Sequence, residues 1–296
     1  MNSSITPPPA NLCVLADQYL MTNEVRSLER AVEKTGISVP LVVVNDPVNP
    51  PIDPDEEANA INKPIGIDTL RILFDVLKRE HAWTFVIAEK KIAEEFGSEA
   101  ASTGRVHVED VPCLSDSDIQ YATPKTKGNW AELPPETVDL VRERCDVAVR
   151  FGFGLLRGDV LHAPEFGVLS FHPADIREYR GLGVPQAWLD GRDTMGVTLQ
   201  RLNDEIDGGE IVAYEEVDVS ECATLWETYD TLYDVKAELL AVGIENLRDP
   251  SFETDVPESF GPYYSIKKRR SLSFASQTLL KNMLGRLRRK TGNRRS

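Results

Sequence analysis

A serine and a histidine stand two residues apart at the end of a short apolar run. The stretch reads "LSFHPADIREYRG", residues 169–181, and Ser170 and His172 flank Phe171 in it. Side chains alternate along a strand, so Ser170 and His172 should share one face while Phe171 points to the other face and is buried. A hydroxyl and an imidazole would then lie together at a strand end, where they could donate hydrogen bonds or move protons.

A carboxylate for this pair is available farther along the chain. Asp207 precedes two glycines in the loop "NDEIDGGE" and could hold His172 in place and favour its charged form. Ser, His and Asp also make up a hydrolase triad, but no GxSxG turn exposes Ser170 as a nucleophile. The pattern therefore argues against a covalent serine hydrolase.

The segments that must position these residues alternate between buried strands and amphipathic helices. A strand at 11–17, a helix at 22–36 and a strand at 40–46 form a unit that opens a parallel sheet with crossover helices. Further strands are expected at 84–88, 106–111, 146–154, 167–172, 196–202 and 211–219, and further helices at 68–80, 136–145 and 224–248. The alternation predicts an α/β protein with a Rossmann-like, open, mostly parallel sheet and flanking helices.

Loops that leave the strands are the expected place for a ligand. Residues 45–64 read as a surface loop, and residues 97–134 are rich in turn formers. Ligands of open parallel sheets bind beyond the carboxyl ends of the strands, so the loops at 151–156, 172–181 and 203–210 should converge. No GxGxxG or GxxxxGK[ST] motif follows the first strand, so this opening does not imply a nucleotide cofactor.

Composition excludes several classes of protein. No run approaches the roughly 18 apolar residues that span a bilayer, and the first residues lack the pattern of a signal peptide, so a cytoplasmic protein is expected. The four cysteines lack CxxC spacing and are expected to be free thiols, buried in the case of Cys13 and Cys145. Only four histidines occur, without an HExxH motif, so no metal site is expected.

Charge is divided sharply along the chain. Residues 260–296 hold eleven of the 33 Lys and Arg residues and none of the 48 Asp and Glu residues. The rest of the chain therefore carries a net charge of −26, against −15 for the whole. A body this acidic repels nucleic acid and argues against a broad RNA-binding face.

Two long motifs resemble the folate-dependent formyltransferases. "SFHPADIREYRG" is similar to their "NxHPSLLPxYRG" signature, and "GVTLQRLNDEIDGGEIV" is similar to their "GvTxhxxxxxxDxGxI" segment, in the same order. "FGFGLL" corresponds to a loop that lines the folate, and "ATLWETYDTLYDVKAELL" resembles the helix that closes the catalytic domain. The resemblance covers residues 135–248 well and implies formyl transfer from 10-formyltetrahydrofolate to a primary amine.

The resemblance also implies roles for single residues. His172 matches the histidine that stabilises the oxyanion and aids proton transfer, and Asp207 matches the carboxylate that orients or charges it. The segments that would hold the folate are Gly154, Leu155, Leu156, Asn203, Asp204, Glu205 and Ile206. Arg180 and Gly181 lie where an acceptor would bind, and an arginine there suits a phosphate or a sugar nucleotide.

Departures from the family pattern bear on activity. The family has an asparagine where this chain has Ser170, and a hydroxyl is a shorter donor than a carboxamide. Loss of one oxyanion donor costs about 2.7 to 4 kcal/mol, or roughly 100- to 1000-fold in rate. Asp175 and Arg177 also replace apolar family residues, and two readings are open for them. They pair with each other or face solvent, or they have a role in binding the substrate.

The basic tail, residues 260–296, contains an amphipathic helical pattern. Its apolar face would consist of Leu272, Leu279, Leu280, Met283, Leu284 and Leu287. Lys281, Arg288 and Arg289 would lie on the opposite face. Such a helix fits attachment to an anionic membrane, docking on an acidic body of its own or a partner chain, or plain packing at the end of the fold.

Together these patterns predict a formyltransferase domain at residues 10–250 followed by the tail. A nucleotide-linked amino sugar is the expected acceptor, and methionyl-tRNA and a ribonucleotide amine are the alternatives. The tail is too short for the barrel domain with which methionyl-tRNA formyltransferases grip tRNA, so tRNA is not expected as a partner. A folate-binding module that lacks transferase activity is the alternative that Ser170 raises.

Overall fold

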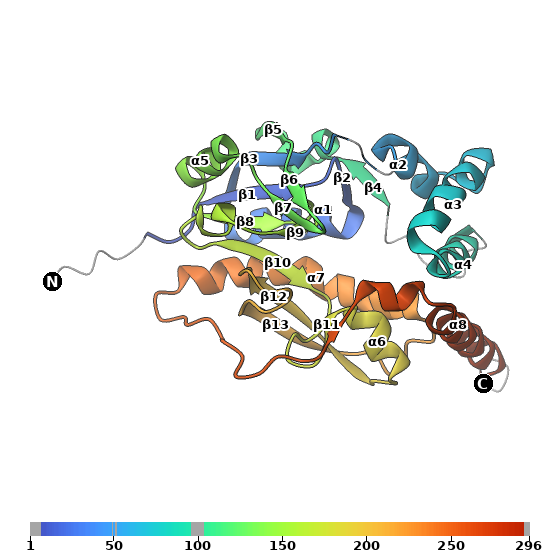
Figure 1. The fold of residues 1–296 in the computed structure, drawn as a ribbon. Helices are drawn as coiled ribbons and strands as arrows, with labels where there is room; N and C mark the ends of the chain where they lie inside the picture. The colour runs from blue at the N-terminus through green and yellow to red at the C-terminus, as the bar shows by residue number, and fades with distance from the viewer. Residues whose placement is uncertain (1–6, 49, 51, 96–103, 293–296) are drawn as a thin grey trace.

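A seven-stranded sheet forms the centre of the molecule (Figure 1). The computed structural model describes residues 7–48, 50, 52–95 and 104–292. The strand order is β13-β12-β10-β8-β1-β3-β5. The bounds are β1 (Asn11–Ala16), β3 (Ser38–Asn45), β5 (Asp118–Ala122), β8 (Val147–Arg150), β10 (Val168–His172), β12 (Thr194–Arg201) and β13 (Glu210–Asp218). Five strands run parallel from β10 to β5, and β12 and β13 run antiparallel, which confirms the predicted open and mostly parallel sheet.

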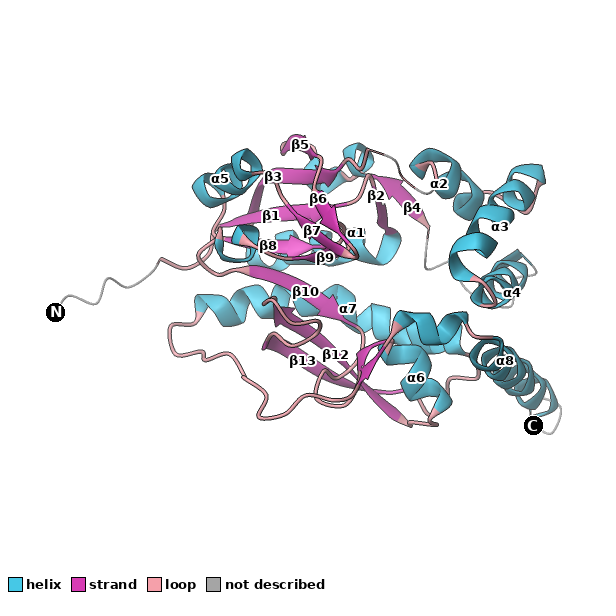
Figure 2. Cartoon of the chain, in the orientation of Figure 1, coloured by secondary structure: helices cyan, strands magenta, loops and turns pink. Residues whose placement is uncertain are grey.

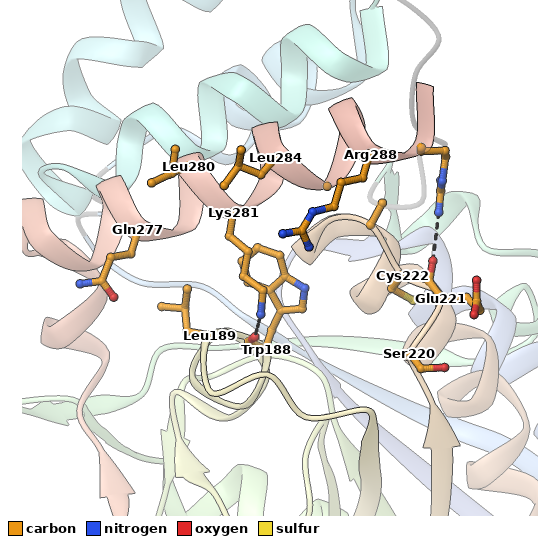
Figure 3. Close-up of a pocket in the computed structure, with 13 residues that line it drawn as sticks. Trp188, Leu189, Ser220, Glu221, Cys222, Gln277, Leu280, Lys281, Leu284 and Arg288 are labelled. Carbon is orange, nitrogen blue, oxygen red and sulfur yellow. Dashed lines mark hydrogen bonds between the residues drawn. The ribbon is translucent and has the colours of Figure 1, made fainter. Parts of the chain in front are cut away.

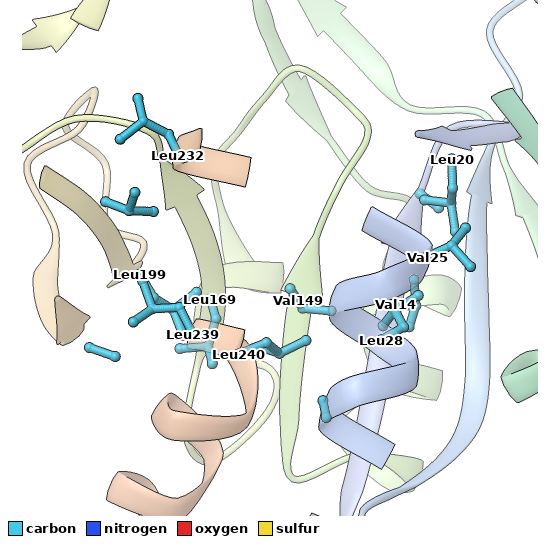
Figure 4. Close-up of a cluster of buried hydrophobic side chains, with 14 of the residues drawn as sticks. Val14, Leu20, Val25, Leu28, Val149, Leu169, Leu199, Leu232, Leu239 and Leu240 are labelled. Atoms are coloured by element: carbon cyan, nitrogen blue, oxygen red, sulfur yellow. The ribbon is translucent and has the colours of Figure 1, made fainter. Parts of the chain in front are cut away.

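Helices cover both faces of this sheet. On one face, α1 (Thr22–Thr35) packs beside α7 (Leu225–Arg248), and their leucines meet those of β10 and β12 in the cluster of Figure 4. On the other face, α5 (Pro135–Arg144) covers β1 and β3. Gly36 ends α1 in the left-handed conformation that glycine adopts without strain, which confirms the predicted stop.

Strand β10 alternates between these two layers. Leu169 and Phe171 pack in the layer of α1 and α7, whereas Val168 packs in the layer of α5. Ser170 and His172 are buried on the α5 side, and Phe171 is half-buried on the opposite side. The predicted alternation is therefore confirmed, and it sets the hydroxyl and the imidazole on one face.

The prediction of a surface loop at 45–64 is wrong for the second half of this segment, which contains the helix α2 (Pro54–Asn62). Asp53 caps this helix, because its carboxylate accepts hydrogen bonds from the backbone N–H groups of Asp55 and Glu56. Pro54 occupies the first helical turn, where a missing N–H costs nothing. The Pro- and Asp-rich sequence here therefore marks the start of a helix rather than a loop.

The expected strand at 84–88 is also wrong, because this run lies in the helix α4 (Trp83–Glu95). A short apolar run does not distinguish a strand from a buried helix. The run packs against α3 (Ile67–Glu80) and the C-terminal helix α8 (Leu272–Gly292), away from the central sheet (Figure 2). Lys90 and Glu94, one turn apart, form an ion pair on α4.

The turn-rich region contains more structure than predicted. Residues 97–103 lie outside the described residues. The strand expected at 106–111 is shorter, because β4 (Arg105–His107) pairs with β2 (Tyr19–Met21) and a 3-10 turn follows at Val108–Asp110. The edge strand β5 was not predicted. Two more short strands, β6 (Lys125–Lys127) and β7 (Trp130–Glu132), join β9 (Leu155–Leu156) in a small sheet.

The remaining elements are short. They are β11 (Arg180–Gly181), α6 (Gly183–Leu189), β14 (Tyr263–Tyr264), and 3-10 turns at Pro112–Leu114, Asp159–His162 and Ile266–Arg270. Strand β14 pairs with β11, which brings the start of the basic tail beside the site. None of the helices in the described ranges is long and apolar enough to cross a membrane.

The C-terminal helix α8 meets the body with a face that is apolar at its start, where Phe274 and Ala275 join the core, and polar farther along. Phe274, Thr278 and Asn282 are buried, and Asn282 accepts a hydrogen bond from the backbone N–H of Leu225 at 2.9 Å. Ion pairs link Arg286 to Glu89 and Arg289 to Glu227. The apolar side chains at 272, 280, 283, 284 and 287 are exposed instead, and Leu280 and Leu284 line a groove next to α6. The predicted amphipathic helix thus docks on its own acidic body and leaves most of its leucines exposed.

Two of the four thiols are buried, as predicted. Cys13 and Cys145 lie in the core, and Cys113 and Cys222 are half-buried. Burial raises the pKa of Cys113 to about 11. None of the four forms a disulfide.

Candidate active site

His172 ends β10 with its ring enclosed by the chain. Its Nε2 donates a hydrogen bond to the backbone carbonyl of Tyr179 at 2.8 Å. Its Nδ1 lies 3.4 Å from Oδ1 of Asp207. Because a carbonyl only accepts, Nε2 carries a hydrogen in this arrangement. The ring is therefore oriented by an acceptor on each side, which suits a group that donates to a developing oxyanion.

Asp207 lies at the centre of a hydrogen-bond network in the loop between β12 and β13. Its Oδ2 accepts from the backbone N–H of Gly181 at 2.7 Å, and its Oδ1 accepts from Nε2 of Gln200 at 3.3 Å. Its φ of +46° is the left-handed conformation that Asp and Asn tolerate better than other side chains. This local turn aims the carboxylate back at the sheet edge and at His172.

Ser170 has a cationic neighbour that the sequence analysis missed. Arg150, at the end of β8, is the register partner of Ser170 on β10, so both side chains lie on one face. Nη2 of Arg150 donates to Oγ of Ser170 at 2.7 Å, and Nε donates to the same oxygen at 3.2 Å. Nη1 donates to the backbone carbonyl of Gly154. An arginine inside an apolar strand run was the available signal, but its partner became visible only with the register.

Gln200 and Asp17 were missed as well. Gln200 is buried on β12 beside Ser170, and its Oε1 accepts from the backbone N–H of Gly209 at 3.0 Å. Asp17 follows β1 and accepts from Nδ2 of Asn45 at 2.8 Å. Burial lowers the pKa of Arg150, and the charges of Asp207 and Asp17 act against that change. The Arg150 guanidinium is thus buried near several carboxylates, including Asp207 and Asp17.

The segments expected to hold a folate flank this row of side chains. The loop at 151–154 is tied to Arg150 through the carbonyl of Gly154, and Leu156 beyond it is buried under β7. The loop at 203–206 leads directly into Asp207, and Oδ1 of Asn203 accepts from the backbone N–H of Glu205 at 2.9 Å. The predicted residues therefore bring two stretches of main chain and apolar surface to one sheet edge. Their role in binding stays a prediction.

Arg180 and Gly181 lie on β11, next to Asp207. Nε of Arg180 donates to the carbonyl of Gly261 at 2.9 Å, and its guanidinium lies over the ring of Phe260. Asp175 and Arg177 form a two-pronged ion pair with each other, with Nε of Arg177 2.9 Å from Oδ1. This pairing confirms one of the two predicted readings of these residues. Among the described residues, no group of three or more His, Cys, Asp or Glu side chains could hold a metal ion.

Gly183 supplies the close contact that fixes the imidazole. A methyl group added there would lie 2.6 Å from Cβ of Ala174 and 3.0 Å from Nε2 of His172. We expect Gly183→Ala to lower the free energy of unfolding by about 1 to 3 kcal/mol through overpacking, and to displace the ring. Chemical denaturation checks this result against Gly66→Ala, where the added methyl group meets only Pro64 O at 3.9 Å. Equal stability of the two variants would contradict the packing described.

A groove with a volume of about 710 Å³ lies elsewhere, between α6, α8 and the segment after β13 (Figure 3). Its walls include Trp188, Cys222 and Leu284. Lys281 reaches across it to the carbonyl of Trp188, and burial lowers the pKa of this lysine. None of the predicted site residues lines this groove, so the sheet edge remains the candidate site.

An open, mostly parallel α/β sheet with a histidine and a carboxylate at the carboxyl edge defines the class of protein. Residues 85–243 match the family model for formyl transferase, and the chain therefore belongs to the formyl transferase family. The methionyl-tRNA formyltransferase of Bacillus subtilis (strain 168) is 24% identical over 180 residues, 59% of this chain and 56% of that protein. The Listeria welshimeri methionyl-tRNA formyltransferase is 26% identical over 140 residues, 46% of this chain and 45% of that protein. The chain thus spans about half the length of the curated relatives it matches.

Solved structures share the fold. A sugar N-formyltransferase from Shewanella sp FDAARGOS_354 gives a TM-score of 0.51 at 13% identity, covering 87% of this chain and 77% of that chain. An N-formyltransferase from Helicobacter canadensis, in complex with folinic acid and dTDP-3-aminofucose, gives 0.50 at 12% identity, covering 90% and 78%. These likenesses agree with the arrangement of strands and helices described above.

Proposed function

We propose that this protein transfers the formyl group of 10-formyltetrahydrofolate to a primary amine. The observation that carries the proposal is the pairing of His172 with Asp207 at the carboxyl edge of the sheet, with Nδ1 and Oδ1 3.4 Å apart. The amine nitrogen bonds to the formyl carbon, the bond from that carbon to N10 of the folate breaks, and a proton moves from the amine to N10. Negative charge builds on the formyl oxygen meanwhile.

The side chains of the site divide this work. The Nε2–H of His172, which donates to the Tyr179 carbonyl in this structure, turns to the formyl oxygen when substrate displaces that contact. Asp207 keeps the ring oriented and balances positive charge on it. The main chain at 154–156 and 203–206 holds the folate, whose ring edge suits backbone donors and acceptors. The folate supplies the formyl group, and its N10 takes up the proton that leaves the amine.

The acceptor we propose is a nucleotide-linked amino sugar. Nε of Arg180 is used by the Gly261 carbonyl, and its two Nη groups meet no hydrogen-bond acceptor within the part of the chain that the structure describes. A guanidinium held in this way suits a phosphate group. The two related structures named above are those of a sugar N-formyltransferase and of an N-formyltransferase that holds a nucleotide-linked amino sugar, which motivates the same choice. Methionyl-tRNA and a ribonucleotide amine also carry phosphate and are the alternatives.

An acceptor panel tests this choice. Purified protein is incubated with 10-formyltetrahydrofolate and, in separate reactions, with amino-sugar nucleotides, a ribonucleotide amine and charged tRNA, and products are identified by mass. Formylation of the sugar nucleotide is the expected result. A product from one of the other amines would rule out the proposed acceptor and would still support the proposed formyl transfer. Folate binding without product from any amine would favour the folate-binding module that Ser170 raises as an alternative.

The outward face of α8 supports a second proposal, reversible attachment of this protein to an anionic membrane surface. Leu280, Met283 and Leu287 are each 52% exposed, and Leu284 is 41% exposed. Arg288 stands at the edge of this face and is exposed. An apolar helix face beside cationic side chains is the pattern of interfacial helices, whereas the acidic body would keep the rest of the molecule off the surface. A cytoplasmic location with such attachment agrees with surface glycan synthesis.

Vesicle binding checks the second proposal. We expect replacement of Leu280, Leu284 and Leu287 by serine to weaken binding to phosphatidylserine-containing vesicles by about 10-fold or more, because less apolar surface is buried. The fold should survive, since these side chains are exposed. Serine at Leu70 and Leu77, exposed on α3, provides the matched control. Equal binding by the parent protein and the triple variant would rule out this surface.

A further inference from the structure

Arg150 lies directly beside Ser170 on the neighbouring strand of the sheet. It ends β8, and the parallel register pairs it with Ser170 on β10. The antiparallel register pairs Ser170 with Gln200 on β12. The three side chains form a row across three adjacent strands, one step from His172. Ser170 is therefore covered on both sides by polar neighbours and is buried.

The hydrogen bonds fix what the Ser170 hydroxyl can do. A guanidinium only donates, so the Ser170 oxygen accepts both contacts from Arg150, at 2.7 Å and 3.2 Å. A hydroxyl oxygen has two lone pairs, and these contacts use both. The O–H bond must then point away from Arg150. The hydroxyl can therefore only donate a hydrogen bond. The position of Arg150 sets the direction in which it donates.

The charge of Arg150 strengthens that donor. A hydrogen bond from a cation draws electron density from the oxygen that accepts it and makes the O–H a better donor. The guanidinium stays charged in a protein, and here Asp207 and Asp17 stabilise its charge from nearby. A serine alone is a weak, rotating donor. A serine held by a buried cation is directed and polarised, as a carboxamide would be.

We propose that Arg150 is a positioning residue for formyl transfer, which turns the Ser170 hydroxyl into the donor for the formyl oxygen. The inference rests on the proposed function. The hydroxyl keeps its proton throughout and stabilises the oxyanion, while the amine proton passes to N10 of the folate as described above. Arg150 and Ser170 together then replace the asparagine that the resemblance places at position 170. Arg150 also holds the Gly154 carbonyl, and so it shapes the loop of the proposed folate site.

A double-mutant cycle tests this coupling. Ser170→Ala and Arg150→Met should each lower kcat about 100-fold, and the double variant should also lose about 100-fold, because both changes remove one donor. Arg150→Lys should retain part of the rate, since an ammonium still donates to the hydroxyl. Ser170→Asn should restore the rate in the Arg150→Met background by supplying an amide donor. KM for the folate should rise only in the Arg150 variants, through the loop at 151–154.

Control variants distinguish a loss of the coupling between Arg150 and Ser170 from a loss of folding. Arg144→Met removes another partly buried arginine that donates to a backbone carbonyl, that of Pro40, and should leave kcat unchanged. Thermal melts of every variant detect unfolding, and the Arg150→Lys and Ser170→Asn variants keep the test valid where Arg150→Met does not fold. Multiplicative losses in the double variant, or a KM change with unaltered kcat, would overturn the coupling alone. Absence of transfer by the unaltered protein would overturn the proposed function and this inference with it.

Discussion

Replacing His172 by alanine should lower the rate of formyl transfer by about 10,000-fold, the upper end for loss of a general acid–base residue. The size follows from two lost functions, since the ring is placed both to donate to the oxyanion and to aid the proton transfer. Its surroundings should hold their shape, because Asp207 keeps its contacts to Gly181 and Gln200. Single-turnover rates with bound folate measure the effect without the influence of product release.

Two comparisons make the His172 result specific. His162→Ala removes an exposed histidine and should leave the rate unchanged. Added imidazole should restore part of the rate of His172→Ala, because the deleted ring leaves space beside Asp207. A loss below about 10-fold in a folded His172→Ala variant would mean that this ring takes no part in the chemistry.

Replacing Asp207 by asparagine should lower kcat about 1000-fold, less than the roughly 10,000-fold loss when the aspartate that orients the histidine of a serine-protease triad becomes asparagine. Asparagine tolerates the left-handed backbone at this position, and its amide oxygen can still accept from the Gly181 N–H. The geometry is thus retained while the charge beside Nδ1 of His172 is lost. The variant therefore separates the charge of the carboxylate from its structural role.

Steady-state kinetics and melting curves check the Asp207 prediction. Asp139→Asn, an exposed change on α5, is the matched control for the same substitution. A melting temperature within a few degrees of the parent protein is expected, together with a change in kcat rather than in KM for the folate. A loss confined to KM would show that Asp207 shapes the folate loop without acting on His172.

Much of the fold could be predicted because its strands and helices carry strong periodic patterns. Leu12 to Ala16 and Leu41 to Val44 are continuous buried runs, and α1 shows apolar residues at helical spacing up to Gly36. The expectation failed at α4, where a five-residue apolar run fits a strand and a buried helix equally well. Packing against α3 and α8 decides between them, and such packing is a tertiary fact.

The site was predictable along one strand and unpredictable across strands. Ser170 and His172 follow from alternation on β10, and Asp207 follows from its motif. The place of Arg150 depends on the register between β8 and β10, which a single sequence does not specify. The same holds for α8, where the leucine pattern suggested the packed face but Thr278 and Asn282 face the body instead. Buried hydrogen bonds, including the 2.9 Å contact from Leu225 to Asn282, make this polar face the better match.

Transfer of an isotopically labelled formyl carbon tests the central claim most directly. The label starts on 10-formyltetrahydrofolate, and mass spectrometry follows it in the folate, in free formate and in an amino-sugar nucleotide. We expect the label to move to the acceptor amine with the unaltered protein and to stay on the folate with His172→Ala. Label that appears only as formate would show hydrolysis and would rule out the proposed transfer to an amine.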